Sequence, residues 1–515
     1  MEHLFDKLEA YGRGNIYPCH MPGHKRRPWG KLPEEMVLRD ITEIDGFDNL
    51  HQPEGILREL QEQAAVLYGA EESFYLVNGS TSGILSAISA ALPAGGHILM
   101  ARNCHKAAYH AAYLRNLTVS YLYPPLMEDY DIVDGIAPEQ VEEALEREPD
   151  IGAVLIVSPT YEGRISDIRK IAEIVHKRNI PLIVDEAHGA HLGFSADFAE
   201  NSCRAGADLV IHSVHKTLPA LTQTALLHVN GGRVDRALLG RFLHIYQSSS
   251  PSYLLMASID NALQYVEKEG AEAFAAFAGN YRKLLADLTA CKHLRFPPLE
   301  QGKQDIGKLL ISTKMTNVSG KELYDIILER YHIQLEMVAE TYALAMFTVN
   351  DTEEGYERMK TALLRIDGEL EAAEKAAYPE NPDSAAGVGC PAEMCSAGTV
   401  HPVERAFVNE VNPLAGTNPG INRLYPVKSL PDTKTLPLAC VWDRKKRYIE
   451  LQDSVGHCVG EFVNLYPPGI PLLVPGERIT AQLLENIRRY LKKGLNVQGL
   501  QADKSSIRIC ILEEE

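Results

Sequence analysis

Polar side chains follow several short apolar runs of the sequence, at positions where they could take part in chemistry. The run "ADLVIHSVHKT" ends in Ser213, His215 and Lys216. A lysine amine is a nucleophile only when it is deprotonated, and partial burial or nearby positive charge lowers its pKa. Because the flanking sequence is apolar, a surface lysine after a strand is the less favoured interpretation. We therefore predict that Lys216 is a nucleophilic amine.

A second cluster lies in "PLIVDEAHGAH", where Asp185 ends an apolar run. A carboxylate that is buried there without a partner would be costly to desolvate, so Asp185 needs a cationic group beside it. His188 follows three residues later and can face the same point. The alternative is an acidic loop with solvated side chains.

Two further clusters lie at the heads of helical stretches. In "NGSTSG" (78–83), glycine permits a tight turn, and Ser80 and Thr81 offer hydroxyls beside free backbone N–H groups. This combination can cradle a phosphate, although a simple Ser/Thr N-cap is the commoner interpretation of such a motif taken alone. His105, in "RNCHKAAYH", stands near the head of another helix. A lone histidine there is more often structural than functional.

Taken together, these groups match the needs of one cofactor. Pyridoxal phosphate requires a lysine for a Schiff base, an anion for its ring nitrogen and a phosphate cup. Lys216, Asp185 and the pair Ser80 and Thr81 supply them, in the chain order of the aminotransferase-like fold. The combination is a stronger signal than any one member.

The elements that must position these residues are short apolar runs that alternate with helical stretches such as 167–179. This alternation predicts an α/β fold with a mainly parallel sheet flanked by helices. Such sheets bind ligands beyond the carboxyl ends of their strands, where the polar clusters lie. A helix is expected from about residue 54 to Gly69. The seven predicted strands lie within 73–77, 97–101, 118–123, 152–160, 181–188, 208–216 and 224–230.

The chain of 515 residues is too long for one hydrophobic core. We predict an irregular N-terminal arm, a cofactor-binding major domain, a smaller α+β domain, a linker or mobile loop, and a C-terminal domain. The linker is predicted from its content of Pro, Gly, Ala and Ser. The corresponding ranges are 1–50, 51–265, 266–375, 376–401 and 402–515.

Composition excludes several classes of protein. The hydrophobic content of 45% and the charged content of 23% are those of a globular protein. The formal net charge of -18, with no basic tract, argues against a general nucleic-acid binder. We see neither a membrane-spanning run nor a signal-peptide pattern, so a cytoplasmic location is expected. Cys390 and Cys395 lack a second ligand pair, so we expect ordinary thiols and no metal site.

With these motifs in place, the chain resembles the ornithine/lysine/arginine decarboxylase family of fold type I enzymes dependent on pyridoxal phosphate. The matching segments span nearly the whole chain, and the resemblance is to the short form without an N-terminal wing domain. The segment 384–401 matches no motif of the family. The motifs are "HMPGHK" (20–25), "NGSTSG" (78–83), "RNCHK" (102–106), "VSPTYEG" (157–163), "DEAHGAH" (185–191), "SVHKT" (213–217), "SSSPSYLLMASID" (248–260) and "YPPGIPLLVPGE" (466–477).

The resemblance implies a role for each matching residue. Lys216 would form the Schiff base, Asp185 would pair with the ring nitrogen and His105 would stack on the ring. His188 would lie close to the ring oxygen, and Glu477 would lie near the substrate entrance, where it could attract a cation. A homodimer or larger assembly is implied, because Ser248 or Ser249 would reach the phosphate of a neighbouring subunit. The phosphate would be held by Ser80, Thr81, Ser213 and His215.

The implied activity is decarboxylation of a basic amino acid, arginine or lysine before ornithine, to carbon dioxide and agmatine or a diamine. Either Lys216 or His188 would return the proton to the α-carbon, and the sequence does not choose between them. One alternative is an aminotransferase or lyase, for which Arg330 would be the candidate carboxylate clamp. Another is a non-catalytic regulatory subunit, which would predict the loss of Lys216 or Asp185, although both are present.

Overall fold

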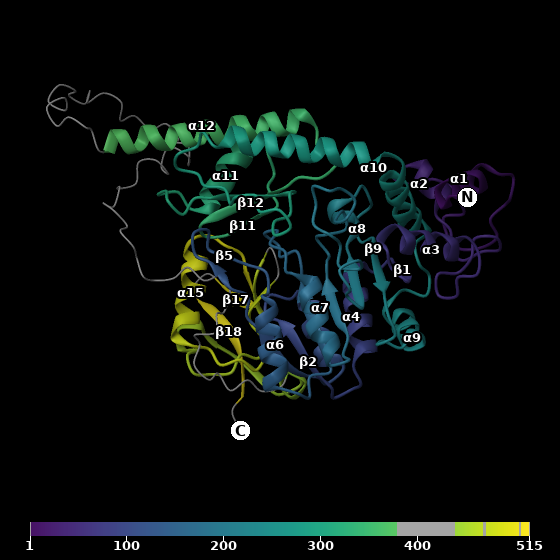
Figure 1. Cartoon of the computed structure of the whole chain (residues 1–515), viewed down its shortest axis with the longest axis horizontal. Coiled ribbons are helices and arrows are strands. Elements are labelled where there is room, and N and C mark those ends of the chain that lie inside the picture. Colours follow the sequence, from purple (N-terminus) through teal and green to yellow (C-terminus); the bar gives the residue numbers. More distant parts are fainter. Residues whose placement is uncertain (1, 378–437, 467–469, 504–505, 514–515) are drawn as a thin grey trace.

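A central β-sheet carries helices on both faces, and two smaller units pack beside it (Figure 1). The computed structural model describes residues 2–377, 438–466, 470–503 and 506–513. Cys390, Cys395, the segment 384–401 and nearly all of the predicted linker lie outside these residues.

The seven predicted runs form the seven strands of the central sheet, in the order β1-β9-β8-β7-β6-β2-β3. Strands β3, β2, β6, β7 and β8 are parallel neighbours, and β9 runs antiparallel to both β8 and β1. The mainly parallel sheet is therefore confirmed. The bounds are β1 Glu72–Leu76, β2 His97–Ala101, β3 Thr118–Leu122, β6 Ala153–Val157, β7 Leu182–Asp185, β8 Leu209–His212 and β9 Ala225–Val229.

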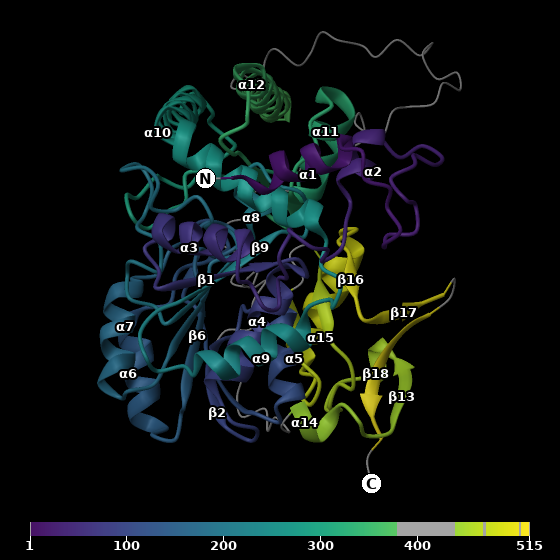
Figure 2. The same ribbon diagram turned by 90° about the vertical axis from the view of Figure 1, so that its right-hand side faces the viewer.

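Helices α6 and α7 cover one face of this sheet, and α4, α5 and α9 cover the other (Figure 2). Because the sheet is covered on both faces, β7, β8 and β9 are fully buried, and they are apolar except at Asp185, His212 and His228. The predicted first helix ends at Gly69, whose φ of 74° few other residues adopt readily. The bounds are α3 Ile56–Tyr68, α4 Gly79–Ala91, α5 Lys106–Leu114, α6 Pro138–Arg147, α7 Ile168–Lys177, α8 Val214–Thr217 and α9 Arg236–Tyr246.

One long helix, α10 (Tyr253–Leu288), joins the major domain to the smaller α+β unit. Its first part, up to Phe274, belongs to the core of the central sheet, and its last part, from Phe277, belongs to the core of the smaller unit. The predicted boundary at 265/266 falls inside this helix and remains a prediction. The smaller unit contains β10 Lys308–Ser312, α11 Gly320–Tyr331, β11 Met337–Val338, β12 Tyr342–Met346 and α12 Glu353–Ala377.

Neither α10 nor any other helix of the described ranges has an apolar stretch that could span a membrane.

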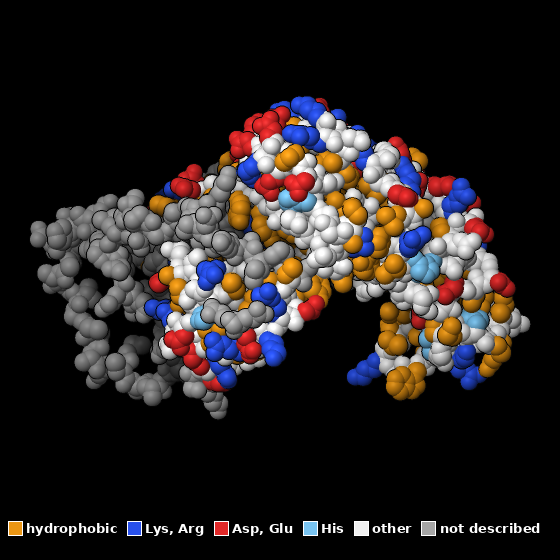
Figure 3. All heavy atoms as spheres, turned by 90° about the horizontal axis from the view of Figure 1, so that it is seen from below, with side chains coloured by type: hydrophobic (Ala, Val, Ile, Leu, Met, Phe, Trp, Pro, Cys, Tyr) orange, Lys and Arg blue, Asp and Glu red, His pale blue; other side chains and the backbone are white. Residues whose placement is uncertain are grey.

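The N-terminal arm is more regular than the sequence predicted, because it contains α1 (Leu4–Arg13) and α2 (Glu34–Arg39). Leu4 and Leu8 stand one helical turn apart and are both fully buried in the main core. The segment between the two helices exposes large apolar side chains, and hydrophobic side chains gather beside a hollow in one face of the molecule (Figure 3). The exposed apolar residues of this segment are Ile16, Tyr17, Met21, Trp29 and Leu32.

The C-terminal unit packs against the end of β2 through a buried ion pair. Arg102 is 1% exposed, and its Nη2 donates to both carboxylate oxygens of Glu477 at 3.1 and 3.0 Å. Its Nη1 donates to the carbonyl oxygen of Pro471 at 2.8 Å, so a second nitrogen of the buried guanidinium has a hydrogen-bond acceptor. The unit contains α14 Leu438–Val441, β13 Lys446–Glu450, β14 Val463–Leu465, β15 Ile470–Leu473, α15 Ala481–Lys492, β16 Val497–Gln498, β17 Leu500–Ala502 and β18 Ile507–Leu512.

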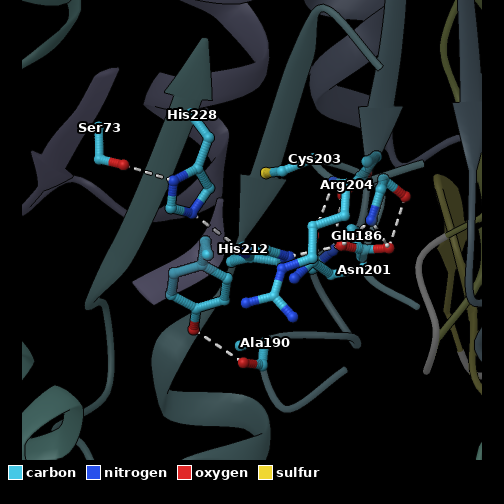
Figure 4. A network of polar contacts seen from close by, with 12 residues as sticks. Ser73, Glu186, Ala190, Asn201, Cys203, Arg204, His212 and His228 are labelled. Atoms are coloured by element: carbon cyan, nitrogen blue, oxygen red, sulfur yellow. Dashed lines mark hydrogen bonds and ion pairs between the residues drawn. The ribbon is translucent and has the colours of Figure 1, made fainter. Parts of the chain in front are cut away.

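A buried chain of polar side chains crosses four strands of the central sheet (Figure 4). Glu186 lies 2.6 Å from His212, the other nitrogen of His212 lies 3.0 Å from His228, and His228 lies 2.6 Å from Ser73. Burial raises the pKa of Glu186 to about 8 and lowers the pKa of His212 to about 3. Glu186 is therefore protonated and His212 is neutral at neutral pH.

With these protonation states, all three hydrogen bonds from Glu186 to Ser73 can run in the same donor-to-acceptor direction. The Glu186 carboxylic acid donates to His212, His212 donates to His228, and His228 donates to Ser73. Glu186 directly follows Asp185, and His212 directly precedes Ser213. The network therefore holds the carboxyl ends of β7 and β8 side by side.

We expect Glu477→Gln to lower the free energy of unfolding by about 3 kcal/mol, because it leaves the Arg102 cation buried without a counter-ion. Thermal unfolding and limited proteolysis of the C-terminal unit measure the effect. The control is Glu485→Gln, which neutralises an exposed carboxylate of the same unit. Equal stability of the two variants would contradict the assignment.

We expect Glu186→Gln to gain stability over the natural chain as the pH rises. The unfolded carboxyl has a pKa near 4.5 and the folded one near 8, so between these values only the folded protein keeps the proton. The natural chain therefore loses stability across this window by up to about 1.4 kcal/mol per pH unit, whereas glutamine does not titrate.

Unfolding midpoints between pH 5 and 9 measure this difference. It should grow up to about pH 8 and then stay constant, while the exposed control Glu173→Gln gives a flat difference. A flat difference for Glu186→Gln would show that this carboxyl is ionised in the folded protein.

Candidate active site

A cavity of about 240 Å³ opens at the carboxyl edge of the central sheet. Eight of the residues predicted from the sequence line it: Ser80, Thr81, His105, Asp185, His188, Ser213, His215 and Lys216. The other lining residues are Gly79, Ile84, Asn103, Val157, Pro159, Tyr161, Ala187 and Ile470. A cavity of this size suits a small molecule.

Asp185 is the last residue of β7, a strand that is fully buried. Burial raises the pKa of its carboxyl, and the Lys216 ammonium acts in the opposite direction. Its hydrogen bond from the backbone N–H of Ala187 is long, at 3.3 Å. A cationic ligand group against this carboxylate would replace the solvation that it lost on folding.

Lys216 is placed by the single turn α8, directly after β8. Its Nζ lies 3.0 Å from Nε2 of His188. Burial lowers the pKa of the Lys216 amine, while Asp185 raises it. The lowered pKa favours the neutral amine that a nucleophile requires.

Small hydroxyls and a helix start form one wall of the cavity. The hydroxyls of Ser80 and Ser213 lie 2.5 Å apart, and Thr81 stands next to Ser80 at the start of α4. Gly79 has a φ of 70°, which turns the backbone sharply into this helix. His215 donates from Nδ1 to the carbonyl oxygen of Thr224 at 2.9 Å. Backbone N–H groups and hydroxyls at a helix start are good donors to an anion.

His105 is the N-cap of α5, where its Nδ1 accepts from the backbone N–H of Ala107 at 3.2 Å. Burial, followed by the Lys216 cation, lowers the pKa of His105 to about 4, so the imidazole is neutral. Nearby, the amide oxygen of Asn103 is buried and accepts no hydrogen bond from the described residues. The cavity thus offers a flat neutral ring and an available acceptor.

These groups fit pyridoxal phosphate. The hydroxyl wall suits the phosphate, Asp185 suits a cationic ring nitrogen, and Lys216 offers its amine to the aldehyde. The incompletely satisfied Asp185 and Asn103 are the structural signs that a polar ligand belongs there.

Four other residues considered from the sequence lie outside the cavity lining. Ser249 is exposed, and its neighbour Ser248 donates its backbone N–H to Asn78 at 3.2 Å, beside the start of α4. Glu477 is paired with Arg102, as described above. Arg330 lies on α11 and is paired with Glu369, which leaves it engaged away from the cavity.

The structure also brings in residues that the sequence did not single out. Tyr161 lines the cavity, and its hydroxyl donates to the exposed carboxylate of Glu336. Lys308, the first residue of β10, lies with Nζ 2.8 Å from Nδ1 of His188. The signal for Lys308 was available in "IGKLLIS", where a lysine opens an otherwise apolar strand.

Comparison with protein families identifies both main parts of the chain. Residues 3–304 match the model of the Orn/Lys/Arg decarboxylase major domain, and residues 431–499 match the model of the C-terminal domain of the same family.

Curated relatives agree over nearly the full length. The chain is 32% identical to the uncharacterized protein YaaO of Bacillus subtilis, over 99% of each chain. It is 29% identical to an arginine decarboxylase of Halalkalibacterium halodurans, over 99% of this chain and 98% of that protein. By contrast, the match to lysine decarboxylase LdcA of Pseudomonas aeruginosa is 26% identical and covers 51% of this chain and 40% of that protein.

Solved structures share the fold at low identity. The lysine decarboxylase LdcF of Francisella novicida has a TM-score of 0.78 at 17% identity, covering 99% of this chain and 81% of its own. Lysine decarboxylase A of Pseudomonas aeruginosa has a TM-score of 0.78 at 19% identity, covering 100% and 80%. The fold type I architecture predicted from the sequence is confirmed. The chain therefore belongs to the Orn/Lys/Arg decarboxylase family and is a pyridoxal-phosphate-dependent amino-acid decarboxylase.

Proposed function

We propose that this protein decarboxylates arginine, or else lysine, with ornithine as the less favoured substrate. The products are carbon dioxide and agmatine or a diamine. The observation that carries the proposal is the meeting of Asp185, Lys216 and the Ser80–Ser213 hydroxyl wall at one cavity. Arginine stands first because relatives named arginine decarboxylase align over nearly the whole chain, whereas the lysine decarboxylase LdcA aligns over half of it.

In this proposal each wall of the cavity has one task. Pyridoxal phosphate, when bound, supplies the electron sink that accepts the electrons of the breaking carbon–carbon bond. Asp185 keeps the ring nitrogen protonated, because a buried carboxylate is best stabilised by a cation. The hydroxyls of Ser80, Thr81 and Ser213 would hold the phosphate, and the neutral ring of His105 would pack against the cofactor.

The proton that returns to the α-carbon comes from Lys216 or from His188. Both groups lie at the same side of the cavity, with Nζ and Nε2 separated by 3.0 Å. Since the pair shares one hydrogen bond, a proton given up by one can be replaced through the other.

The cationic end of the substrate needs a carboxylate, and we propose that Glu336 provides it. Its carboxylate accepts a hydrogen bond from Tyr161, whose side chain lines the cavity. Among the described residues no cation lies within ion-pair distance of Glu336, whereas Glu477 is occupied by Arg102. The negative charge of Glu336 also raises the pKa of Lys216, in the direction expected of a carboxylate near the cavity.

We further propose that the active unit is at least a dimer. The arm between α1 and α2 exposes apolar side chains, with Trp29 84% exposed, and the molecule is hollowed on one face (Figure 3). Such surfaces mark protein–protein contacts. Ser248 and Ser249 are exposed next to the phosphate wall, which suits a contact between two active sites. A cytoplasmic location remains a prediction.

The function is tested by incubating the cofactor-loaded protein with arginine, lysine and ornithine in turn. We expect released carbon dioxide and one amine, identified by its mass, and no keto acid. Lys216→Ala should lose both the visible absorbance of the bound cofactor and the activity, because among the described residues Lys216 is the lysine that lines the cavity. Lys170→Ala, on the exposed side of α7, is the matched control. Turnover retained by Lys216→Ala, or a keto acid as product, would overturn the proposal.

We expect Glu336→Gln to raise the KM for the preferred basic amino acid about tenfold with kcat little changed, since it removes one partly solvated charge interaction. Steady-state kinetics with arginine and with the uncharged analogue citrulline measure the effect. The ratio of kcat/KM for arginine to kcat/KM for citrulline should fall in this variant. It should be unchanged in the control Glu329→Gln, which neutralises an exposed carboxylate of α11. An unchanged KM would assign recognition of the cation to another group.

A further inference from the structure

A second cavity, of about 430 Å³, lies at the edge of the central sheet and shares no lining residue with the candidate active site. It opens between α3 and α10, beside the edge strand β1. Its volume lies in the range of small-molecule sites. Nothing in the proposed function uses this cavity.

One side of this cavity is a strip of apolar side chains. Leu60 and Ala64 of α3 and Leu263 of α10 line it and are buried. Leu67 and the exposed Val66 extend the strip along α3. An aliphatic chain is the kind of ligand group that loses unfavourable contact with water on such a strip.

Carboxylates from both helices surround the strip. Of the described residues that line the cavity, four are Asp or Glu and none is Lys, Arg or His. Glu59 of α3 and Glu267 of α10 are exposed, and neither has an ion-pair partner in the part of the chain that the structure describes. Glu62 is already paired with Arg58 at 2.8 Å. An excess of negative charge around one cavity attracts a cation.

The cavity also contains a buried hydroxyl that the fold leaves unpaired. Tyr75, on β1, is 1% exposed, and among the described residues its phenol hydroxyl has no hydrogen-bond partner. Its backbone is satisfied, because its N–H donates to Gln61 at 2.9 Å and its carbonyl oxygen accepts from Gln247 at 3.4 Å. A buried hydroxyl without a partner destabilises the fold, and a hydrogen bond to a ligand removes this cost.

The charge nearest to this hydroxyl indicates what kind of group binds there. Asp260 of α10 also lines the cavity, and it is held by the N-terminal arm, since Leu4 donates its backbone N–H to Oδ2 at 2.8 Å. Nδ1 of His3 lies 3.1 Å from Oδ1. Burial, followed by the charge of Asp260, raises the pKa of Tyr75 well above its usual value, so its hydroxyl stays neutral. A neutral hydroxyl near a carboxylate suits an ammonium or guanidinium donor.

We propose that this cavity binds a linear aliphatic dication, either a diamine or an aminoalkyl guanidine. One cationic end binds at Tyr75, the aliphatic chain follows the apolar strip, and the other end lies between Glu59 and Glu267. Agmatine and the diamines, the products of the proposed function, belong to this class. The inference rests on that function only for the source of the ligand.

The first test is calorimetric titration of the cofactor-loaded full-length protein with 1,5-diaminopentane and with agmatine. An amine that enters the active site changes the visible absorbance of the cofactor, so that event is counted separately. We expect a further binding event that leaves the absorbance unchanged. Tyr75→Phe should weaken it about tenfold, because a buried acceptor is lost, and Glu267→Gln about fivefold, because one exposed charge is lost. Glu269→Gln, an exposed carboxylate of α10 outside the cavity lining, is the matched control.

The second test is thermal unfolding, which reports whether the hydroxyl is unpaired. Without amine, Tyr75→Phe should unfold at the natural temperature or above it, because the change removes a buried hydroxyl that has no partner. Added 1,5-diaminopentane should raise the Tm of the natural chain and of Glu269→Gln more than that of Tyr75→Phe. A Tyr75→Phe variant that is less stable than the natural chain would show that the hydroxyl is bonded within the fold, and would overturn the inference.

Three other outcomes would also overturn it. The first is the absence of any binding event besides that at the active site, and the second is equal affinity in the natural chain, Tyr75→Phe and Glu267→Gln. The third is dissociation of the assembly in Val66→Asp, measured by sedimentation, which would assign this surface to a contact between copies of the chain. Failure of the proposed function is separate, because it would appear as absent amine release from a chain that binds the dication.

Discussion

Two buried ionisable groups of opposite sign, Asp185 and Lys216, share the carboxyl edge of one sheet. Each destabilises the fold when it is charged alone, because burial removes its hydration, and each partly compensates the other. This compensation is incomplete, since burial dominates the pKa of both groups. The cavity is therefore a site that folding leaves electrostatically unsatisfied, and a ligand with a cationic nitrogen and an aldehyde completes it.

The strand ends that carry these groups must be held rigidly in place. The hydrogen-bonded chain from Glu186 to Ser73 provides this support, because it ties the strand ends that carry Asp185 and Ser213 without placing a net charge in the core. An ionised Glu186 next to Asp185 would add a second buried negative charge and raise the cost of both. The raised pKa of Glu186 is thus consistent with the ionisation that Asp185 needs.

The sequence was informative where function depends on neighbours in the chain. Asp185 and His188 are three residues apart, and Ser213, His215 and Lys216 lie within one turn, so their chemistry could be inferred from local pattern and strand ends. The seven strands were predictable because short, largely apolar runs alternate with helical stretches, although β3, at the sheet edge, buries only Leu122 fully. The helix α1 was missed because its apolar positions become informative only once the core that buries Leu4 and Leu8 is known.

Contacts between distant segments could not be predicted. The partner of Glu477 is Arg102, and the partner of His188 is Lys308, and no local pattern links either pair. The place of Glu477 near the substrate entrance remains a prediction, and the structure adds that its carboxylate pairs with Arg102 and so joins two domains. Glu336 carries no motif, and its relation to the cavity arises only because Tyr161 bonds to it across the domain boundary.

The residues around the cavity come from three parts of the chain, and this has a physical consequence for the site. Asp185 and Lys216 belong to the major domain, Lys308 and Glu336 belong to the smaller unit, and Ile470 comes from the C-terminal unit. The contact between the Lys308 Nζ and Nδ1 of His188 then depends on how the smaller unit sits on the sheet. The groups around the cavity are thereby coupled to domain packing, and the long helix α10, buried in both cores, is the element that keeps this packing fixed.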